Sequence, residues 1–331
     1  MLLGNQFIWA EGGATFNSLT ENSCLQKPRF TCLNPDSYVD QESQFSEEIF
    51  IQRYQLYNPG SRAEVSLSVL EELASEYNVQ LVSFGTLVIE GASFSAPSIS
   101  ACAANITIRD LTSISASARG CEQNQGLGKG TFDPADCTAQ GASGASAGGL
   151  PISSNPDQTC SQAQQPGINV FSEGSGGASL SSTGSRGGGV IQLSSSNMLK
   201  FSNSTIEANG ENGVFSQKSA GGGAAGAIHI IARSVVGNGR IEAIGGNGSK
   251  EGGSGGSGGY ISFALLNITD PRSQHLWEGS FSLEGGKGGM ANFGQSGSGS
   301  PGLFSQVDCP AGHTSVLCAP CPIGYFKYHY G

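Results

Sequence analysis

Two glutamates occupy equivalent positions in two similar segments of the chain. Glu207 and Glu242 each stand in the tripeptide Ile-Glu-Ala. If the two segments are adjacent strands, their outward carboxylates lie one strand apart, where they repel each other and can shift a pKa or bind a cation. Two carboxyl groups at a short separation are also the groups that hydrolyse glycosidic bonds.

The residues around this pair do not complete an active site. A third copy of the segment has Ser282 in place of the glutamate, and we identify no aspartate cluster, catalytic lysine or arginine beside the pair. We therefore interpret Glu207 and Glu242 as part of a solvated outer face. A carbohydrate-active β-helix enzyme, either a polysaccharide hydrolase or a lyase, is the alternative function, and only analogy between folds supports it.

Cysteine is the second residue type that can do chemistry here. Nine cysteines are present, with Cys24 and Cys32 the first two, and the pair Cys318-x-x-Cys321 near Cys309 could hold zinc. The spacing does not match a regular zinc site and no thioredoxin-like context surrounds it, so we expect structural disulfides. The disulfide candidates are Cys102, Cys121, Cys137, Cys160, Cys309, Cys318 and Cys321.

Other motifs do not indicate a cofactor or a metal. In the tract GGNGSKEGGSGG, Lys250 is followed by Glu251, whereas a phosphate-binding loop needs Ser or Thr there. The calcium-binding nonapeptide needs an Asp that the tract lacks. His229 alternates with Ile228 and Ile230, so we interpret it as a strand residue rather than a ligand.

Charge and hydropathy limit the partners of the chain. Its 16 basic residues are scattered and outnumbered by 26 acidic ones, so we expect no nucleic-acid partner. No run of 18 apolar residues occurs, so no membrane span is expected within this sequence, although a membrane anchor could follow it. The sequons at Asn105, Asn203, Asn247 and Asn267 are compatible with N-glycosylation in a secretory pathway.

The sequence divides into three zones. We assign no fold to residues 1–60, a glycine-rich β-strand region to residues 61–305, and a small cysteine-rich segment to residues 306–331. Within the second zone, the stretch from Val65 to Tyr77 also fits helical spacing, so a short helix stays open there. The odd cysteine number and an opening without a basic leader suggest a fragment of a larger protein.

Internal repetition from about Gly187 onward is the strongest structural signal. Three glycine-rich approaches lead into alternating apolar strands, and a second strand follows each: STIEANGENG, GRIEAIGGNG and SFSLEGGKGG. Such a unit cannot bury its apolar face alone, so the copies must stack, with Ile206, Ile241 and Phe281 forming one ladder. A right-handed parallel β-helix or related β-solenoid is therefore expected, with glycines at the turns. The alternative is a β-sandwich with glycine-rich loops.

Two known groups of proteins share these patterns. The segments NITI, GAIHIIA and IEAIGGNG resemble the large glycine-rich proteins of plants, ciliates and oomycetes, over roughly residues 80–300. That resemblance implies a β-helical surface or secreted molecule. The segment CPAGHTSVLCAPCPIGYFK, from Cys309 to Lys327, resembles the start of an ephrin-receptor-like or TNF-receptor-like cysteine-rich repeat.

These observations favour a non-catalytic extracellular module over an enzyme. A stacked framework with a surface rich in Ser, Gly and Asn suits adhesion or ligand display, and contact with a protein or a glycan through many weak sites. We expect an extracellular or cell-surface location. The sequence does not name the ligand.

Overall fold

The computed structural model is all-β in the part of the chain that it describes. That part comprises residues 7–10, 14–19, 63–66, 78–131, 137–155, 157–164, 173–179, 185–214, 220–265, 276–306, 313–314 and 319–320. No helix occurs within those ranges. Correspondingly, the described residues contain no helix long and apolar enough to cross a membrane.

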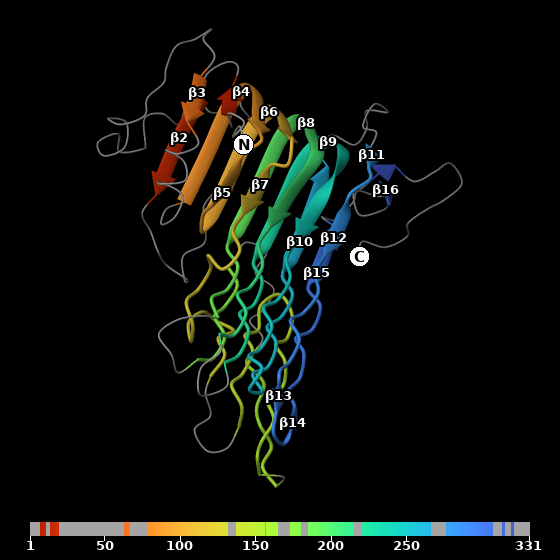
Figure 1. Ribbon diagram of the computed structural model, residues 1–331. Coiled ribbons are helices and arrows are strands. Elements are labelled where there is room, and N and C mark those ends of the chain that lie inside the picture. The colour runs from red at the N-terminus through yellow and green to blue at the C-terminus, as the bar shows by residue number, and fades with distance from the viewer. Residues whose placement is uncertain are drawn as a thin grey trace.

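One parallel sheet dominates the fold (Figure 1). Its strands run in the order β15-β10-β9-β8-β6-β4, and neighbouring strands in this series pair in parallel. Their bounds are Asn78–Glu90 for β4, Ser98–Arg109 for β6, Val190–Glu207 for β8, Ala227–Glu242 for β9, Tyr260–Leu265 for β10 and Leu303–Gln306 for β15. The β-sandwich, which was the alternative fold, is built from antiparallel sheets and therefore differs from this parallel arrangement.

The long strands bend, so that each repeat contributes three successive runs to the stack. Register shifts at Ser195/Met198 and Phe201/Ser204 mark the bends in the pairing of β8 with β9. The third runs are the C-terminal ends of β8 and β9 together with three short strands: β5 (Ser93–Ser95), β7 (Ser113–Ser115) and β12 (Ser280–Ser282). The short strand β11 (Leu276–Trp277) pairs with the second run of β9.

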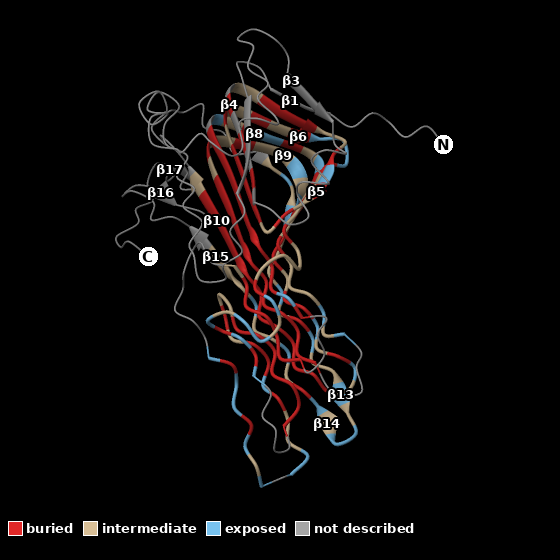
Figure 2. Ribbon diagram, turned by 90° about the vertical axis from the view of Figure 1, so that its left-hand side faces the viewer, coloured by how far each residue is buried: buried red, intermediate tan, exposed pale blue. Residues whose placement is uncertain are grey.

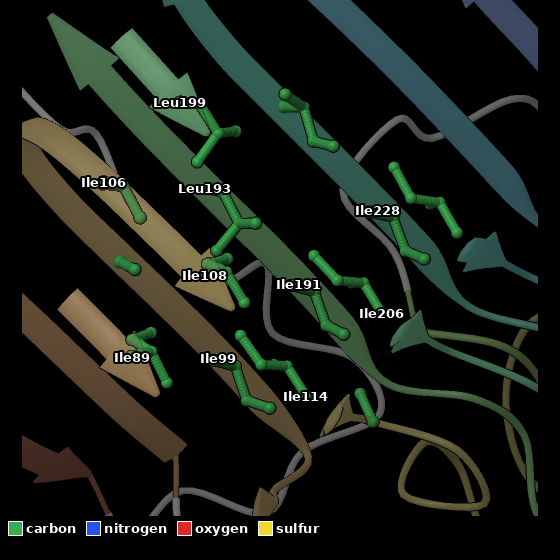
Figure 3. Packing of buried hydrophobic residues seen from close by; sticks show 14 of the residues in the cluster. Ile89, Ile99, Ile106, Ile108, Ile114, Ile191, Leu193, Leu199, Ile206 and Ile228 are labelled. Atoms are coloured by element: carbon green, nitrogen blue, oxygen red, sulfur yellow. The ribbon is translucent and has the colours of Figure 1, made fainter. Parts of the chain in front are cut away.

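Apolar ladders fill the space between the runs. Ile206 pairs with Ile241, which pairs with Phe281, as the repeat predicted, and Ile114 extends this ladder by one step. The segment containing Ile114 is therefore a further copy of the repeat that precedes the three recognised in the sequence. Figure 3 shows Ile114 and Ile206 among the buried isoleucines and leucines that gather between the strands. Branched side chains suit this arrangement because they pack closely on a pleated surface.

The N-terminal end of the stack is covered by antiparallel strands. Strands β1 (Phe7–Ala10) and β2 (Ala14–Leu19) pair antiparallel with β4, and β3 (Ala63–Ser66) pairs with β1. Val65 thus lies in a strand, while residues 67–77 of the proposed helix lie outside the described residues. The antiparallel strands occupy the edge of β4 that another parallel strand would need.

The glycine-rich tracts form a second layer of structure rather than loops. We call it the glycine bundle; its extended segments run side by side below the strands in Figure 1, and buried residues line its centre in Figure 2. These segments are residues 116–131, 137–149, 173–179, 185–189, 208–213, 220–226, 243–249, 253–259, 284–289 and 296–302. The connections from β8 to β9, from β9 to β10 and from β12 to β15 each send one tract away from the stack and another back. The long connection from β7 to β8 supplies the other four segments.

Hydrogen bonds in the glycine bundle follow a period of three residues. In segment 253–259, each N–H donates to the same neighbouring segment as the N–H three residues later. The acceptors are Ala139 and Ala142 for Ser254 and Ser257, Gly297 and Ser300 for Gly255 and Gly258, and Gly246 and Ala243 for Gly256 and Gly259. Three residues per turn is the geometry of polyproline II, which makes no hydrogen bonds within its own chain.

Close packing of backbones explains why these tracts need glycine. A Cβ at Gly256 would lie 2.5 Å from the carbonyl carbon of Gly223 and closer still to its oxygen. Only Gly91, Gly126, Gly237, Gly252 and Gly294 have a positive φ among the glycines of the described ranges. The expectation that glycines serve mainly at turns is therefore wrong, and their main role resembles that of glycine at the crowded axis of collagen.

Asparagine side chains on the outer edge of the glycine bundle accept hydrogen bonds from the backbone of neighbouring segments. The Asn212 Oδ1 accepts the backbone N–H of Asn247, and the Asn247 Oδ1 accepts that of Lys287, both at 2.7 Å. Asn209 makes the same contact one turn earlier along the tract. On another segment, Pro301 is exposed and has no N–H to leave unpaired. At these positions the outward backbone donors are thus satisfied or removed.

One disulfide joins a segment of the glycine bundle to residues 157–164 beside it in the chain. Cys137 and Cys160, two of the disulfide candidates, are bonded to each other across 23 residues. Cys102 is half-buried on β6, and Cys121 is buried in the bundle. Among the C-terminal residues, only the short antiparallel pair β16 (His313–Thr314) and β17 (Ala319–Pro320) is described. Cys309, Cys318 and Cys321 lie outside the described residues.

Candidate functional site

The outward side of the third runs is a continuous polar surface, which we call the polar face. It consists of two rows of side chains that stay in register across five repeats. The first, the hydroxyl row, is Ser93, Ser113, Thr205, Arg240 and Ser280. The second, the carboxylate row, is Ser95, Ser115, Glu207, Glu242 and Ser282.

Alternation along short strands creates these rows. Between each pair of outward positions stands an inward apolar residue, such as Ile206 between Thr205 and Glu207, and it is buried in the core. Because side chains alternate between the two sides of a strand, the inward ladder forces the polar residues outward. Parallel strands lie about 4.8 Å apart, so successive side chains of one row repeat at that distance.

The carboxylate pair lies where the sequence predicted, with one glutamate on each of two adjacent strands. Glu207 pairs in register with Glu242. The pKa of Glu207 is raised, first because burial disfavours its charged form and second because the Glu242 charge repels it. A hydrogen bond with Ser115 and the positive charge of Arg240 oppose this rise. Asn209 also donates its amide Nδ2 to Glu207 at 3.3 Å.

Arg240 completes this cluster and was missed in the sequence. Its guanidinium forms an ion pair with the carboxylate of Glu242, which is almost fully buried, while Arg240 itself is exposed. The spacing could have revealed it, because Arg240 stands two residues before Glu242 and side chains two residues apart lie on the same side of a strand. The ion pair compensates the buried charge and makes Glu242 a poorly accessible group for a large substrate.

A second arginine contacts the polar face near its other end. The Arg119 Nε donates to the Ser95 hydroxyl at 3.2 Å. By contrast, the hydroxyls of Ser93, Ser113 and Thr205 make no hydrogen bond within the described part of the chain. The carboxylate row is therefore largely engaged with its own neighbours, whereas the hydroxyl row is open to an external partner.

The predicted glycosylation residues lie apart from one another. Asn203 is exposed with a φ of 47° at the bend before the third run of β8. Asn105 is half-buried and accepts a hydrogen bond from the Asn197 amide at 2.9 Å. Asn247 is exposed on the edge of the glycine bundle, and Asn267 lies outside the described residues.

Within the described ranges, no group of three or more histidine, cysteine, aspartate or glutamate side chains is arranged to hold a metal ion. His229 is buried on β9, where its Nδ1 lies 2.7 Å from the Ser262 hydroxyl, so it belongs to the strand as the alternation predicted. The polar face is thus the arrangement of side chains best placed to meet a partner.

Comparisons with known proteins add no assignment to this geometry. No family model matches the chain, and neither a curated protein nor a solved structure matches it.

Proposed function

We propose that this chain is a non-catalytic extracellular interaction module, part of a larger cell-surface protein, built on a β-solenoid. The in-register polar face is the observation that carries the proposal. A row of similar groups repeated at a constant distance favours a partner that is itself repetitive, because weak contacts then add along its length. The three runs per repeat and their parallel ladders support the β-solenoid architecture.

The disulfide supports the proposed location. Cys137 and Cys160 are bonded in the structure, and stable disulfides form mainly in secreted and cell-surface proteins. The exposed Asn203 and Asn247 offer acceptor sites for glycans in the same compartment. The resemblance of the C-terminal cysteines to an ephrin-receptor-like repeat points in the same direction.

One experiment tests the proposal against its enzymatic alternative. The chain is expressed with a secretory leader in cultured eukaryotic cells, and the purified protein is incubated with a panel of polysaccharides. We expect secretion with the Cys137–Cys160 bond formed, retention on one or more polymers, and no release of reducing ends. Retention within the cells with both cysteines reduced contradicts the extracellular location.

A carbohydrate-active enzyme is the second candidate because two carboxyl groups lie in register on adjacent strands, and glycosidases act through a pair of carboxyl groups. Burial and the neighbouring Glu242 raise the pKa of Glu207, and Arg240 forms an ion pair with Glu242. If the parent protein releases reducing ends and both Glu207→Gln and Glu242→Gln abolish that release, the chain is an enzyme and the non-catalytic role is wrong.

A further inference from the structure

The hydroxyl row has hydrogen-bonding capacity that the folded chain leaves unused. Ser93 and Ser280 are exposed, and Ser113 and Thr205 are half-buried. None of these four hydroxyls has a hydrogen-bond partner in the described part of the protein. Each of these hydroxyls can donate one hydrogen bond and accept others, so four of the five positions of the row present both functions, while Arg240 can only donate.

The spacing of the row fits a particular kind of polymer. Five in-register positions at about 4.8 Å span roughly 19 Å along the stack. One sugar ring of an extended glycan advances by about the length of one such step, so successive rings can meet successive repeats. An extended peptide lying along the same axis would direct the backbone donors and acceptors of every second residue to one side, about 6.6 Å apart, which does not match the spacing of the row.

Charge determines which glycans fit. The single cation of the row, Arg240, is paired with Glu242, and Glu207 lies beside them. The chain carries a net charge of -10, which disfavours the approach of a polyanion. A glycan without charged groups avoids this repulsion and still offers a hydroxyl to each step of the row.

We propose that the hydroxyl row binds a neutral, linear glycan that lies along the axis of the strand stack. This inference rests on the proposed function and names the partner class of that same face. Binding is weak for each sugar ring, since the row contains no aromatic ring on which a sugar could stack, and it strengthens with the number of rings that contact the row.

The test measures binding of linear neutral gluco-oligosaccharides to the full chain by isothermal titration calorimetry. The probes are a β-1,4-linked and a β-1,3-linked hexasaccharide, the corresponding disaccharides, and a sulfated heparin hexasaccharide. The variant Ser113→Ala/Thr205→Val removes two adjacent hydroxyls of the row. Thr107→Val is the matched control, because it removes an outward hydroxyl from the second run of β6.

We expect at least one neutral hexasaccharide to bind more tightly than its disaccharide, and the double variant to bind it about tenfold more weakly. The control should stay within about twofold of the parent. Equal affinity of parent and double variant overturns the inference. So does binding of only the heparin fragment, or of none of the probes; in those cases an interaction module that binds another partner survives, and the secretion experiment tests it separately.

Discussion

Gly256→Ala is the sharpest test of the glycine bundle. The Gly256 N–H donates to Gly246 and its carbonyl accepts the N–H of Gly286, each at 2.8 Å. The added methyl would lie 2.5 Å from the carbonyl carbon of Gly223, so the two segments must move apart by about 1 Å to restore an ordinary contact. That movement lengthens hydrogen bonds on both sides of the segment.

The expected loss of stability follows from these contacts. Overpacking of a dense interior costs about 1–3 kcal/mol, and each weakened hydrogen bond costs up to about 1 kcal/mol. Replacing glycine by alanine offsets about 0.5 kcal/mol of this loss, because alanine lowers the conformational entropy of the unfolded chain. The net loss is about 2–4 kcal/mol, which lowers Tm by roughly 3–6 °C in a protein of this size.

Differential scanning calorimetry and far-UV circular dichroism measure the change, and Ser257→Ala is the matched control. Ser257 is fully buried in the same segment, and its hydroxyl has no hydrogen-bond partner in the described residues. Removing an unpaired buried hydroxyl is neutral or slightly stabilising. A Tm for Gly256→Ala within 2 °C of the parent would refute the close-packed bundle.

Three further perturbations probe charge, cross-linking and edge closure. The raised pKa of Glu207 means that its contribution to stability is full below its ordinary pKa near 4.5 and is lost as the pH rises through the folded-state value. Glu207→Gln should therefore stabilise the protein at pH 7 by up to about 1 kcal/mol and lose that advantage at pH 4, as urea titrations at the two pH values will show. Replacing Cys137 and Cys160 by alanine opens a loop closed across 23 residues and should cost about 3 kcal/mol, measured by urea unfolding; an unchanged midpoint would contradict the bond. Asn212→Ala removes the acceptor for a backbone N–H of the neighbouring segment and should cost about 1 kcal/mol, with faster amide exchange confined to that edge; unaltered exchange would contradict the edge role.

The ladders of the stack were readable in the sequence because their signal is local. Ile206, Ile241 and Phe281 recur with the same neighbours, and alternation fixes which side of the strand each faces. Once the repeat was recognised, the adjacency of Glu207 and Glu242 followed. What could not be obtained this way was the environment of the pair, since the near-complete burial of Glu242 depends on the packing of the whole surface.

The glycine bundle was not anticipated, for a different physical reason. Polyproline II segments make no hydrogen bonds of their own, so their partners lie in distant parts of the chain and leave no local apolar pattern. Glycine-rich, low-charge sequence is also the composition of flexible linkers. A usable signal did exist in the three-residue period of GGSGGSGG and EGGKGG, which fits three residues per turn.

The same period permits the glycine bundle to change length without disturbing the strands. Adding three residues to each leg of one tract pair keeps every N–H directed at its former neighbour, and moves the turn outward by about 9 Å. Adding one or two residues would instead rotate the donors toward the wrong segments. Related chains are therefore expected to differ here by multiples of three residues per leg, with the length of the bundle acting as an adjustable spacer between the strand stack and whatever its far end meets.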